Sequence, residues 1–93
     1  MSSNIYALTR TERYKDYDGK AIIDKRLWGY FKNKKDFYDF IKEEKLWFDE
    51  YTYEVDLFIQ TDTTATFGGI AKKSYEKFIV EFVIEELEEI TND

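Results

Sequence analysis

Hydrophobic and polar residues alternate most regularly in segment 51–60. The apolar residues of one parity are Tyr51, Tyr53, Val55, Leu57 and Ile59. A period of two is typical of a strand that turns one face to the core. The pattern therefore predicts a strand here, with Phe58 on the opposite face, exposed to solvent or buried in an interface.

Two further strands are expected near the N-terminus. Residues 4–10 have moderate β-propensity, and residues 21–31 form an aliphatic and aromatic run. Asp18 and Gly19 between them are typical of a hairpin turn, because glycine tolerates positive φ. Gly29 inside the second run predicts a bulge or bend that changes which face the side chains take.

A helix is predicted to follow the second strand. Asn33 has the properties of an N-cap, and Phe37, Phe40 and Ile41 recur at the spacing of one helical face. Lys45 marks the expected end, since a basic residue suits the last turn of a helix.

The last apolar segment, residues 75–90, fits two periods. A helical stripe would contain Tyr75, Phe78, Ile79, Phe82, Val83, Leu87 and Ile90. One face of a strand would instead contain Phe78, Val80, Phe82 and Ile84, and the β-branched content favours that alternative. Sixteen residues without a break exceed the usual length of a strand, so we expect a helix with Ser74 as its N-cap.

These elements together predict the fold class. A polar turn at 61–64 and a short run at 65–67, which Gly68 and Gly69 would end, add a fourth strand to the three longer ones. We expect an α+β protein of β-β-α-β-β-α order. It would be a two-layer sandwich, with a mainly antiparallel sheet of three or four strands and two helices on one face. The 93 residues are expected to form a single domain, 1–93.

The composition narrows the chemistry. The chain has no cysteine, histidine or proline, and 19% of its residues are aromatic. A Ser-His-Asp or Cys-His nucleophile and the usual zinc sites are therefore excluded. The carboxylates, lysines and tyrosines form no pattern that indicates a reaction. We expect no catalytic residue, no metal and no cofactor, and a protein that is not an enzyme.

One loop resembles a calcium site in part. Asp16, Asp18 and the later Asp24 place carboxylates at nearly alternating positions, as hard oxygen ligands would be placed. A third ligand at the next alternate position and a closing Glu are missing. A hairpin turn with solvated acids is the preferred interpretation.

The negative charge is concentrated at the C-terminal end. Residues 1–73 contain thirteen acids and thirteen bases, so the whole net charge of −6 belongs to residues 74–93. The acidic cluster consists of Glu81, Glu85, Glu86, Glu88 and Glu89. On a helix these like charges would repel one another and the negative helix end. The cluster therefore indicates either solubility or a binding role.

The binding role would be that of a negatively charged ridge. Glutamates one helical turn apart rise about 5.4 Å, while consecutive phosphates of one DNA strand rise about 3.4 Å. Such a ridge is a coarse match to a row of phosphates. The partner would be a protein with a basic groove that normally holds nucleic acid.

Small size, acidity, the absence of cysteine, many Tyr and acidic residues and an αβ pattern together resemble one class of proteins, the small phage-encoded inhibitors of bacterial defence. These are anti-CRISPR and anti-restriction proteins of the nucleic-acid-mimic kind. The resemblance is one of overall character and rests on no motif. It implies a non-enzymatic protein-binding module in the cytoplasm of a bacterial host, with no direct nucleic acid and no membrane as partner. No signal peptide and no membrane-length apolar run is seen.

Two alternatives stay open. Trp28 and Tyr30 lead into Lys32, Lys34 and Lys35, and rings beside lysines suit single-stranded DNA or RNA. The chain could instead be a small phage accessory protein that forms a homodimer or a larger oligomer through its surplus aromatic residues.

Overall fold

The computed structural model describes residues 4–16, 18–71 and 76–88. The elements are β1 (Asn4–Lys15), β2 (Ala21–Phe31), α1 (Lys34–Trp47), the π-helical turn η1 (Phe48–Thr52), β3 (Tyr53–Gln60), β4 (Thr64–Ala71) and β5 (Lys77–Glu88). The α+β class is confirmed. The expected arrangement of three or four strands with two helices is wrong, because five strands and a single α-helix are present among the described residues.

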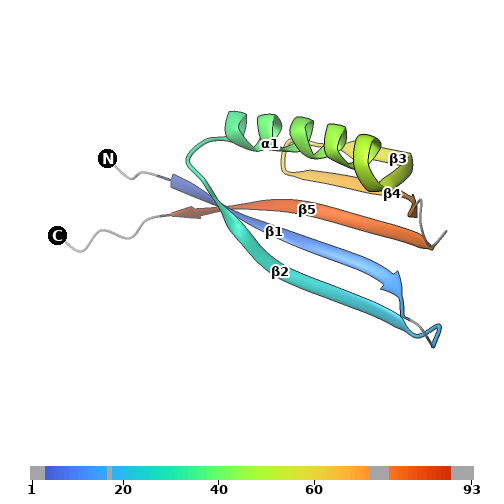
Figure 1. Cartoon of the computed structure of the whole chain (residues 1–93). Helices are drawn as coiled ribbons and strands as arrows, with labels where there is room; N and C mark the ends of the chain where they lie inside the picture. Colours follow the sequence, from blue (N-terminus) through green and yellow to red (C-terminus); the bar gives the residue numbers. More distant parts are fainter. Residues whose placement is uncertain (1–3, 17, 72–75, 89–93) are drawn as a thin grey trace.

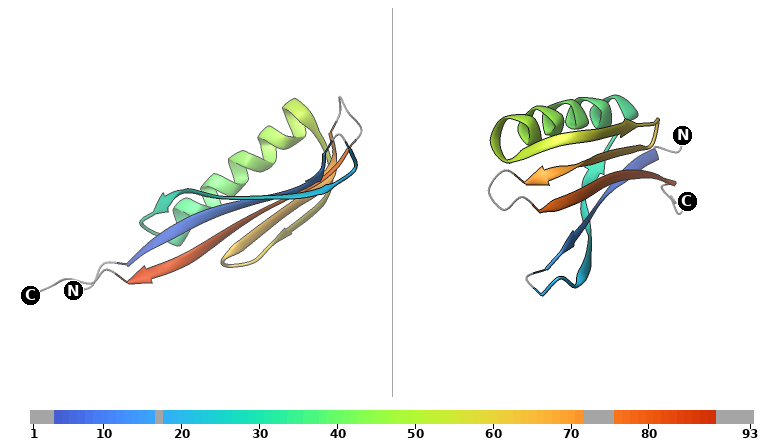
Figure 2. Two further views of the ribbon diagram at one scale, coloured as in Figure 1. Left: turned by 90° about the horizontal axis from the view of Figure 1, so that it is seen from below. Right: turned by 90° about the vertical axis from the view of Figure 1, so that its right-hand side faces the viewer.

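The five strands form one antiparallel sheet in the order β2-β1-β5-β4-β3. β5 is the central strand, while β2 and β3 are the edges. Helix α1 connects the two edge strands and lies against one face of the sheet (Figure 1). The turn end of the β1–β2 hairpin points away from α1 (Figure 2).

The last apolar segment is therefore a strand, not the predicted helix. β5 pairs with β1 on one side, from Asn4 opposite Glu88 to Arg13 opposite Ile79, and with β4 on the other. A central strand is covered by backbone hydrogen bonds along both sides and can have apolar residues on both faces. Apolar residues on both faces of this strand also fit the spacing of a helical stripe, and the helix was predicted for that reason. Ser74, Tyr75 and Ile90 of the predicted stripe lie outside the described residues.

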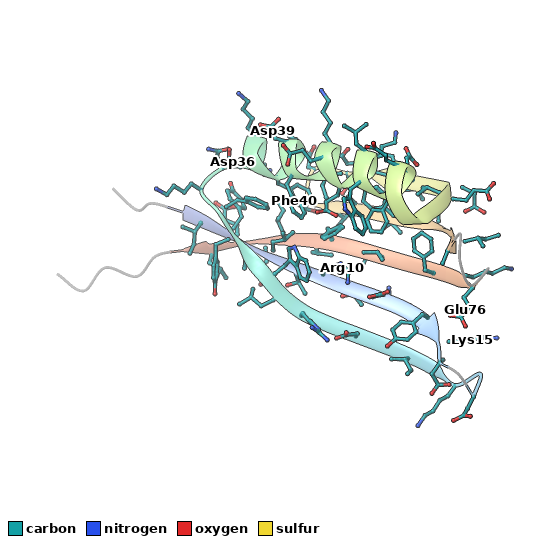
Figure 3. All side chains as sticks on the ribbon, in the orientation of Figure 1. Arg10, Lys15, Asp36, Asp39, Phe40 and Glu76 are labelled. Carbon is teal, nitrogen blue, oxygen red and sulfur yellow. The ribbon has the colours of Figure 1, made fainter. Side chains whose placement is uncertain are left out.

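Alternate residues of β5 form the centre of the core. Phe78, Val80, Phe82 and Ile84 are at most 5% exposed and face α1. The helix contributes Phe37 and Ile41, and Phe48 follows from η1. Phe40 also points from α1 toward the sheet, whereas Asp39 points away (Figure 3). The Phe40 ring meets the Phe82 ring edge to face, with the ring centres 5.3 Å apart. Large rings fill this small core, as the composition suggested.

The predicted start of the helix is confirmed. The Asn33 side chain accepts a hydrogen bond from the backbone N–H of Asp36 at 2.9 Å, so it is the N-cap. The helix continues two residues beyond the expected end at Lys45, to Trp47. Among the described residues, no helix is both long and apolar enough to cross a membrane.

The predicted first hairpin is also confirmed, with a turn at Asp18 and Gly19. Gly19 has a φ of 80°, in the left-handed region that glycine favours. Asp16 accepts hydrogen bonds on Oδ1 from the backbone N–H groups of Asp18 and Lys20, at 2.9 and 2.8 Å. Its carboxylate therefore holds the turn. Within the described ranges no group of three or more acidic side chains is placed to hold a metal ion.

A bulge in β3 reverses the predicted orientation of the side chains that follow it, whereas Val55, before the bulge, packs against the core as predicted. The register shifts between Val55 and Leu57, so Phe58 turns into the core and its ring lies 4.9 Å from that of Phe67. Leu57 and Ile59, expected in the core, are 39% and 53% exposed. The prediction of an outward Phe58 is wrong because an extra residue in a strand resets the period of two. The side chains of Tyr51 and Tyr53 lie outside those described.

β4 also differs from expectation, since it runs through Gly68 and Gly69 to Ala71. Gly69 lies beside the β3 bulge, and a Cβ there would collide with the carbonyl oxygen of Glu54. The two glycines therefore permit close strand pairing and do not end the strand.

Candidate protein-binding surface

The face of the sheet opposite α1, here called the open face, has no element of the described chain packed on it. The side chains alternate along each strand, so the residues of β5 on this face are Lys77, Ile79, Glu81, Val83, Glu85 and Leu87. The pairing registers extend this parity to the other four strands.

Cross-strand rows define the open face. One row runs Ile23, Arg13, Ile79, Gly68 and Leu57, from β2 to β3. The next rows are Lys25, Thr11, Glu81, Thr66 and Ile59, then Leu27, Thr9, Val83 and Thr64, then Tyr30, Ala7 and Glu85. Threonines thus occupy the middle of the face, and larger apolar side chains lie on both sides of them.

Many of these larger side chains are exposed. Those of 38% to 66% exposure on the open face are Ile23, Leu27, Tyr30, Leu57, Ile59, Ile79 and Leu87. Single exposed apolar residues are normal on a protein surface, but a grouped set on one face marks an interaction surface. Leu57 lies over Gly68, where a Cβ would be 3.2 Å from the Leu57 Cβ, and beside Ile79 in the same row.

Two hollows interrupt this face. One, of 260 Å³, is lined by Thr9, Thr11, Arg13, Ile23, Lys25, Glu81, Val83 and Glu85. The second, of 250 Å³, lies over Gly68 and Gly69 at the β3 side. The open face is therefore not flat.

The charge of the sheet changes from one side to the other. β1 and β2 contain five bases and two acids, whereas β3, β4 and β5 contain one base and six acids. On the open face this places Arg13 and Lys25 on the β1–β2 side and Glu81 and Glu85 on β5. The half with β2 is therefore positive and the half with β3 is negative.

The predicted acidic ridge is not formed as expected, because its segment is not helical. Glu81 and Glu85 lie on the open face, while Glu86 belongs to the opposite parity. The side chain of Glu88 and the whole of Glu89 lie outside the described residues. The geometric match between a helical ridge and a row of phosphates is therefore lost. A binding role for these glutamates stays a prediction.

The predicted nucleic-acid segment is also divided between two faces. Trp28 is the extra residue of a bulge in β2, which confirms the bend expected beside Gly29. It lies on the α1 side, with the Arg10 guanidinium 5.2 Å from its ring centre. Tyr30 is paired with Ala7 on the open face and is 58% exposed. Because the bulge separates them, the two rings do not form one platform for stacked bases.

The predicted lysines lie at the end of β2 and the start of α1. Lys32 directly follows β2, and Lys34 and Lys35 open the helix, with all three side chains exposed. They therefore surround the Asn33 cap and are remote in sequence from the central rows of the open face.

A small pocket on the α1 side is lined by two tryptophans and two charged residues. It has a volume of 220 Å³ and is lined by Arg10, Trp28, Glu44, Trp47 and Phe48. Burial raises the pKa of Glu44, an effect opposed by the positive charge of Arg10 and reinforced by Glu43. Arg10 also pairs with Glu12 at 3.1 Å. Since the chain's own Arg10 already lies over Trp28, this cluster is explained by internal packing.

A further hollow, of 390 Å³, lies where β1 ends and β5 begins. Its lining includes Lys15, Lys77 and Phe78, and we assign no role to it.

The apolar residues of the open face were missed in the sequence. The signal was present in Ile79, Val83 and Leu87, which place apolar residues at odd positions of β5 as well as at even ones. In a strand that pattern indicates two contact faces.

Comparison of the chain with protein-family models, with curated proteins and with solved structures gives no match. The function is therefore inferred from the surface alone.

Proposed function

We propose that this protein is a non-enzymatic protein-binding module and that its binding surface is the open face of the sheet. The observation that carries the proposal is that the two faces of the sheet are covered to different extents. Helix α1 seals one face, while the other leaves Ile23, Leu27 and Ile79 exposed by 66%, 59% and 41%. Exposure of grouped apolar side chains costs free energy, which burial against a partner recovers.

The edges of the sheet support binding through the face. Edge strand β2 contains the charged run Asp24, Lys25 and Arg26 and a bulge at Trp28. Edge strand β3 contains Glu54 and the bulge at Asp56. Charges and bulges on edge strands oppose the addition of another strand. A partner is therefore expected on the face.

The chemistry of the open face also suits a protein partner. Apolar side chains alternate with threonines, and a few charges of both signs lie among them, such as Lys25 and Glu81. Protein interfaces combine an apolar centre with satisfied polar groups in this way. Single-stranded nucleic acid is less suited, because Trp28 and Tyr30 lie on opposite faces.

The partner class expected from the sequence, a nucleic-acid-handling bacterial protein with a basic groove, stays a prediction. It now rests on the acidic composition alone, since the helical ridge is not formed. The role as an inhibitor of bacterial defence is likewise a prediction from overall character.

The test compares two exposed faces of the same molecule. Proteins that bind the immobilised parent chain, a second copy included, are titrated with the variant Ile23→Ser plus Leu27→Ser. We expect affinity to fall at least about tenfold, because burial of two large aliphatic side chains contributes several kcal/mol. Leu46→Ser is the matched control, since Leu46 is 63% exposed on α1 and lies away from the open face.

Parental affinity in the double variant would place the binding surface elsewhere and contradict the proposal. The unfolding midpoint of each variant is measured first, so that a loss of binding is not confused with a loss of folding.

A further inference from the structure

We propose that the occupant of the open face is a second copy of this chain. The two copies pack face to face about a twofold axis that lies between the two sheets, over β1 and parallel to it. This inference rests on the proposed function, because it names the partner of the same surface. In such a symmetric interface each contact occurs twice, once in each direction.

The rows of the open face are complementary to themselves under this symmetry. A twofold axis along β1 keeps the rows aligned and brings β2 of each copy over β5 of the other. Leu27 then meets Val83 and Ile23 meets Ile79, so apolar residues lie on apolar residues. In the row between them, Lys25 meets Glu81.

The next row adds a polar contact. Tyr30 and Glu85 are the β2 and β5 members of the row through Ala7. In the dimer the Tyr30 hydroxyl of each copy can donate a hydrogen bond to the Glu85 carboxylate of the other. A hydrogen bond to a charged acceptor is among the stronger kinds.

The division of charge across the sheet supports the same partner. The chain has a net charge of −6, so two copies repel each other at long range. The arrangement about β1 opposes β2 of each copy, which has Lys25 on the open face, to β5 of the other, which has Glu81 there. It therefore replaces general repulsion with two local attractions.

The centre of the contact has the right size. The strand on the axis contributes Ala7, Thr9 and Thr11, whose short side chains let two sheets approach to the usual spacing of about 10 Å. The overlap involves β2, β1 and β5 of each copy, which are three neighbouring strands of the sheet.

The position of the axis is decided by charge. An axis along β5 would place Glu81 against Glu81 of the other copy, in an apolar setting where like charges are costly. An axis along β1 instead brings Arg13 near Arg13 of the other copy. Arg13 is two residues from Thr11, at the end of the paired region, and its long side chain can turn toward the partner's Glu81.

The test is an exchange of charges in the full-length chain. We expect the parent to double its mass with concentration in light scattering. Lys25→Glu and Glu81→Lys should each raise the dimer Kd at least about tenfold, since each places two like-charge pairs in the interface. An equimolar mixture of the two variants should recover the dimer, because every opposed pair in the mixed species has opposite signs.

Lys42→Glu is the control, since Lys42 is exposed on α1 and undergoes the same change of charge away from the open face. It should leave the parental Kd unchanged. Circular dichroism of each variant checks that the sheet is intact.

Two results would overturn the inference. A parent that stays monomeric at all concentrations excludes the second copy, and a dimer that the two exchanges leave unchanged lies on another surface. Neither result alone excludes binding of a different protein. That larger claim is decided by the Ile23→Ser plus Leu27→Ser titration, so the two failures can be told apart.

Discussion

The two faces of β5 both have large apolar side chains, but these are buried on one face and exposed on the other. Toward α1, Phe82 is fully buried and Val80 is 1% exposed. Toward the open face, Ile79 is 41% and Leu87 is 38% exposed. Apolar residues lie on both faces of the strand, but among the described residues only the face toward α1 is covered.

This difference bears on the stability of the fold. Helix α1 covers one face of the five-stranded sheet, and no element of the described chain covers the other. The apolar residues of the covered face stabilise the fold by their burial. Those of the open face are exposed, so they add little to the stability of a single copy.

The largest expected effect comes from the covered face. Phe82→Ala should lower the free energy of unfolding by about 3–5 kcal/mol, because it opens a cavity between Phe40 and Phe67. That is a large part of the 5–15 kcal/mol typical of small proteins. Val83→Ala, one residue away on the open face, should cost less than about 1.5 kcal/mol. Urea unfolding at low protein concentration measures both.

Equal losses in these two variants would contradict the distinction between the faces. A loss at Val83 that appears only at high protein concentration would instead locate it in the proposed dimer.

The second prediction tests the close pairing of β3 and β4 at the bulge. Gly69→Ala should destabilise by about 1–3 kcal/mol, since the added Cβ collides with the Glu54 carbonyl at the bulge. Gly29→Ala is the matched control in edge strand β2, where no atom lies within 4 Å of the new Cβ. It should be neutral or stabilise by up to about 1 kcal/mol, because alanine loses less entropy on folding. Thermal unfolding of both variants decides the point.

The local features of this fold were predictable from the sequence. The Asp18–Gly19 turn and the Asn33 cap each depend on a few neighbouring residues, whose side chains satisfy or shape the adjacent backbone. The two strands joined by that turn were predictable for the same reason.

The sheet as a whole was not predictable in this way. β1 and β5 pair residues that are 66 to 84 positions apart, from Arg13 with Ile79 to Asn4 with Glu88. β5 has apolar residues on both faces, so its length and its apolar positions matched a helix as well. The bulge at Asp56 has no local signal, and it exchanges the orientations of Leu57 and Phe58.

The predictions of the site residues were wrong for the same reasons. Glu81, Glu85, Glu88 and Glu89 were expected on one side of a helix, but the segment from Lys77 to Glu88 is a strand. Trp28 and Tyr30 have the same parity, but the bulge turns them to different faces. A surface can be derived only after the registers are known.

The third prediction concerns the first turn of α1, the helix that covers one face of the sheet. Asn33→Ala removes the acceptor for the Asp36 N–H and should cost about 1 kcal/mol. Asn33→Asp keeps an acceptor and should stay near the parent. Chemical denaturation gives the stabilities, and amide hydrogen exchange should show faster exchange at the start of α1. Unchanged exchange there would show that packing of Phe37, and not the cap, holds this end of the helix.

The smallest expected effect concerns a carboxylate that the covered face partly dehydrates. Burial raises the pKa of Glu44 above its ordinary value of 4.5, with Arg10 opposing and Glu43 reinforcing the change. The folded protein thus binds this proton more tightly than the unfolded chain, and stability falls as pH rises through the folded pKa. Glu44→Gln should therefore be more stable than the parent at about pH 7, and the gain should vanish at about pH 4. Glu43→Gln should lower the titration midpoint of the Glu44 carboxyl in NMR, because a like charge is removed. A Glu44→Gln gain that persists in acid would show that amide packing, and not the loss of a dehydrated charge, is its cause.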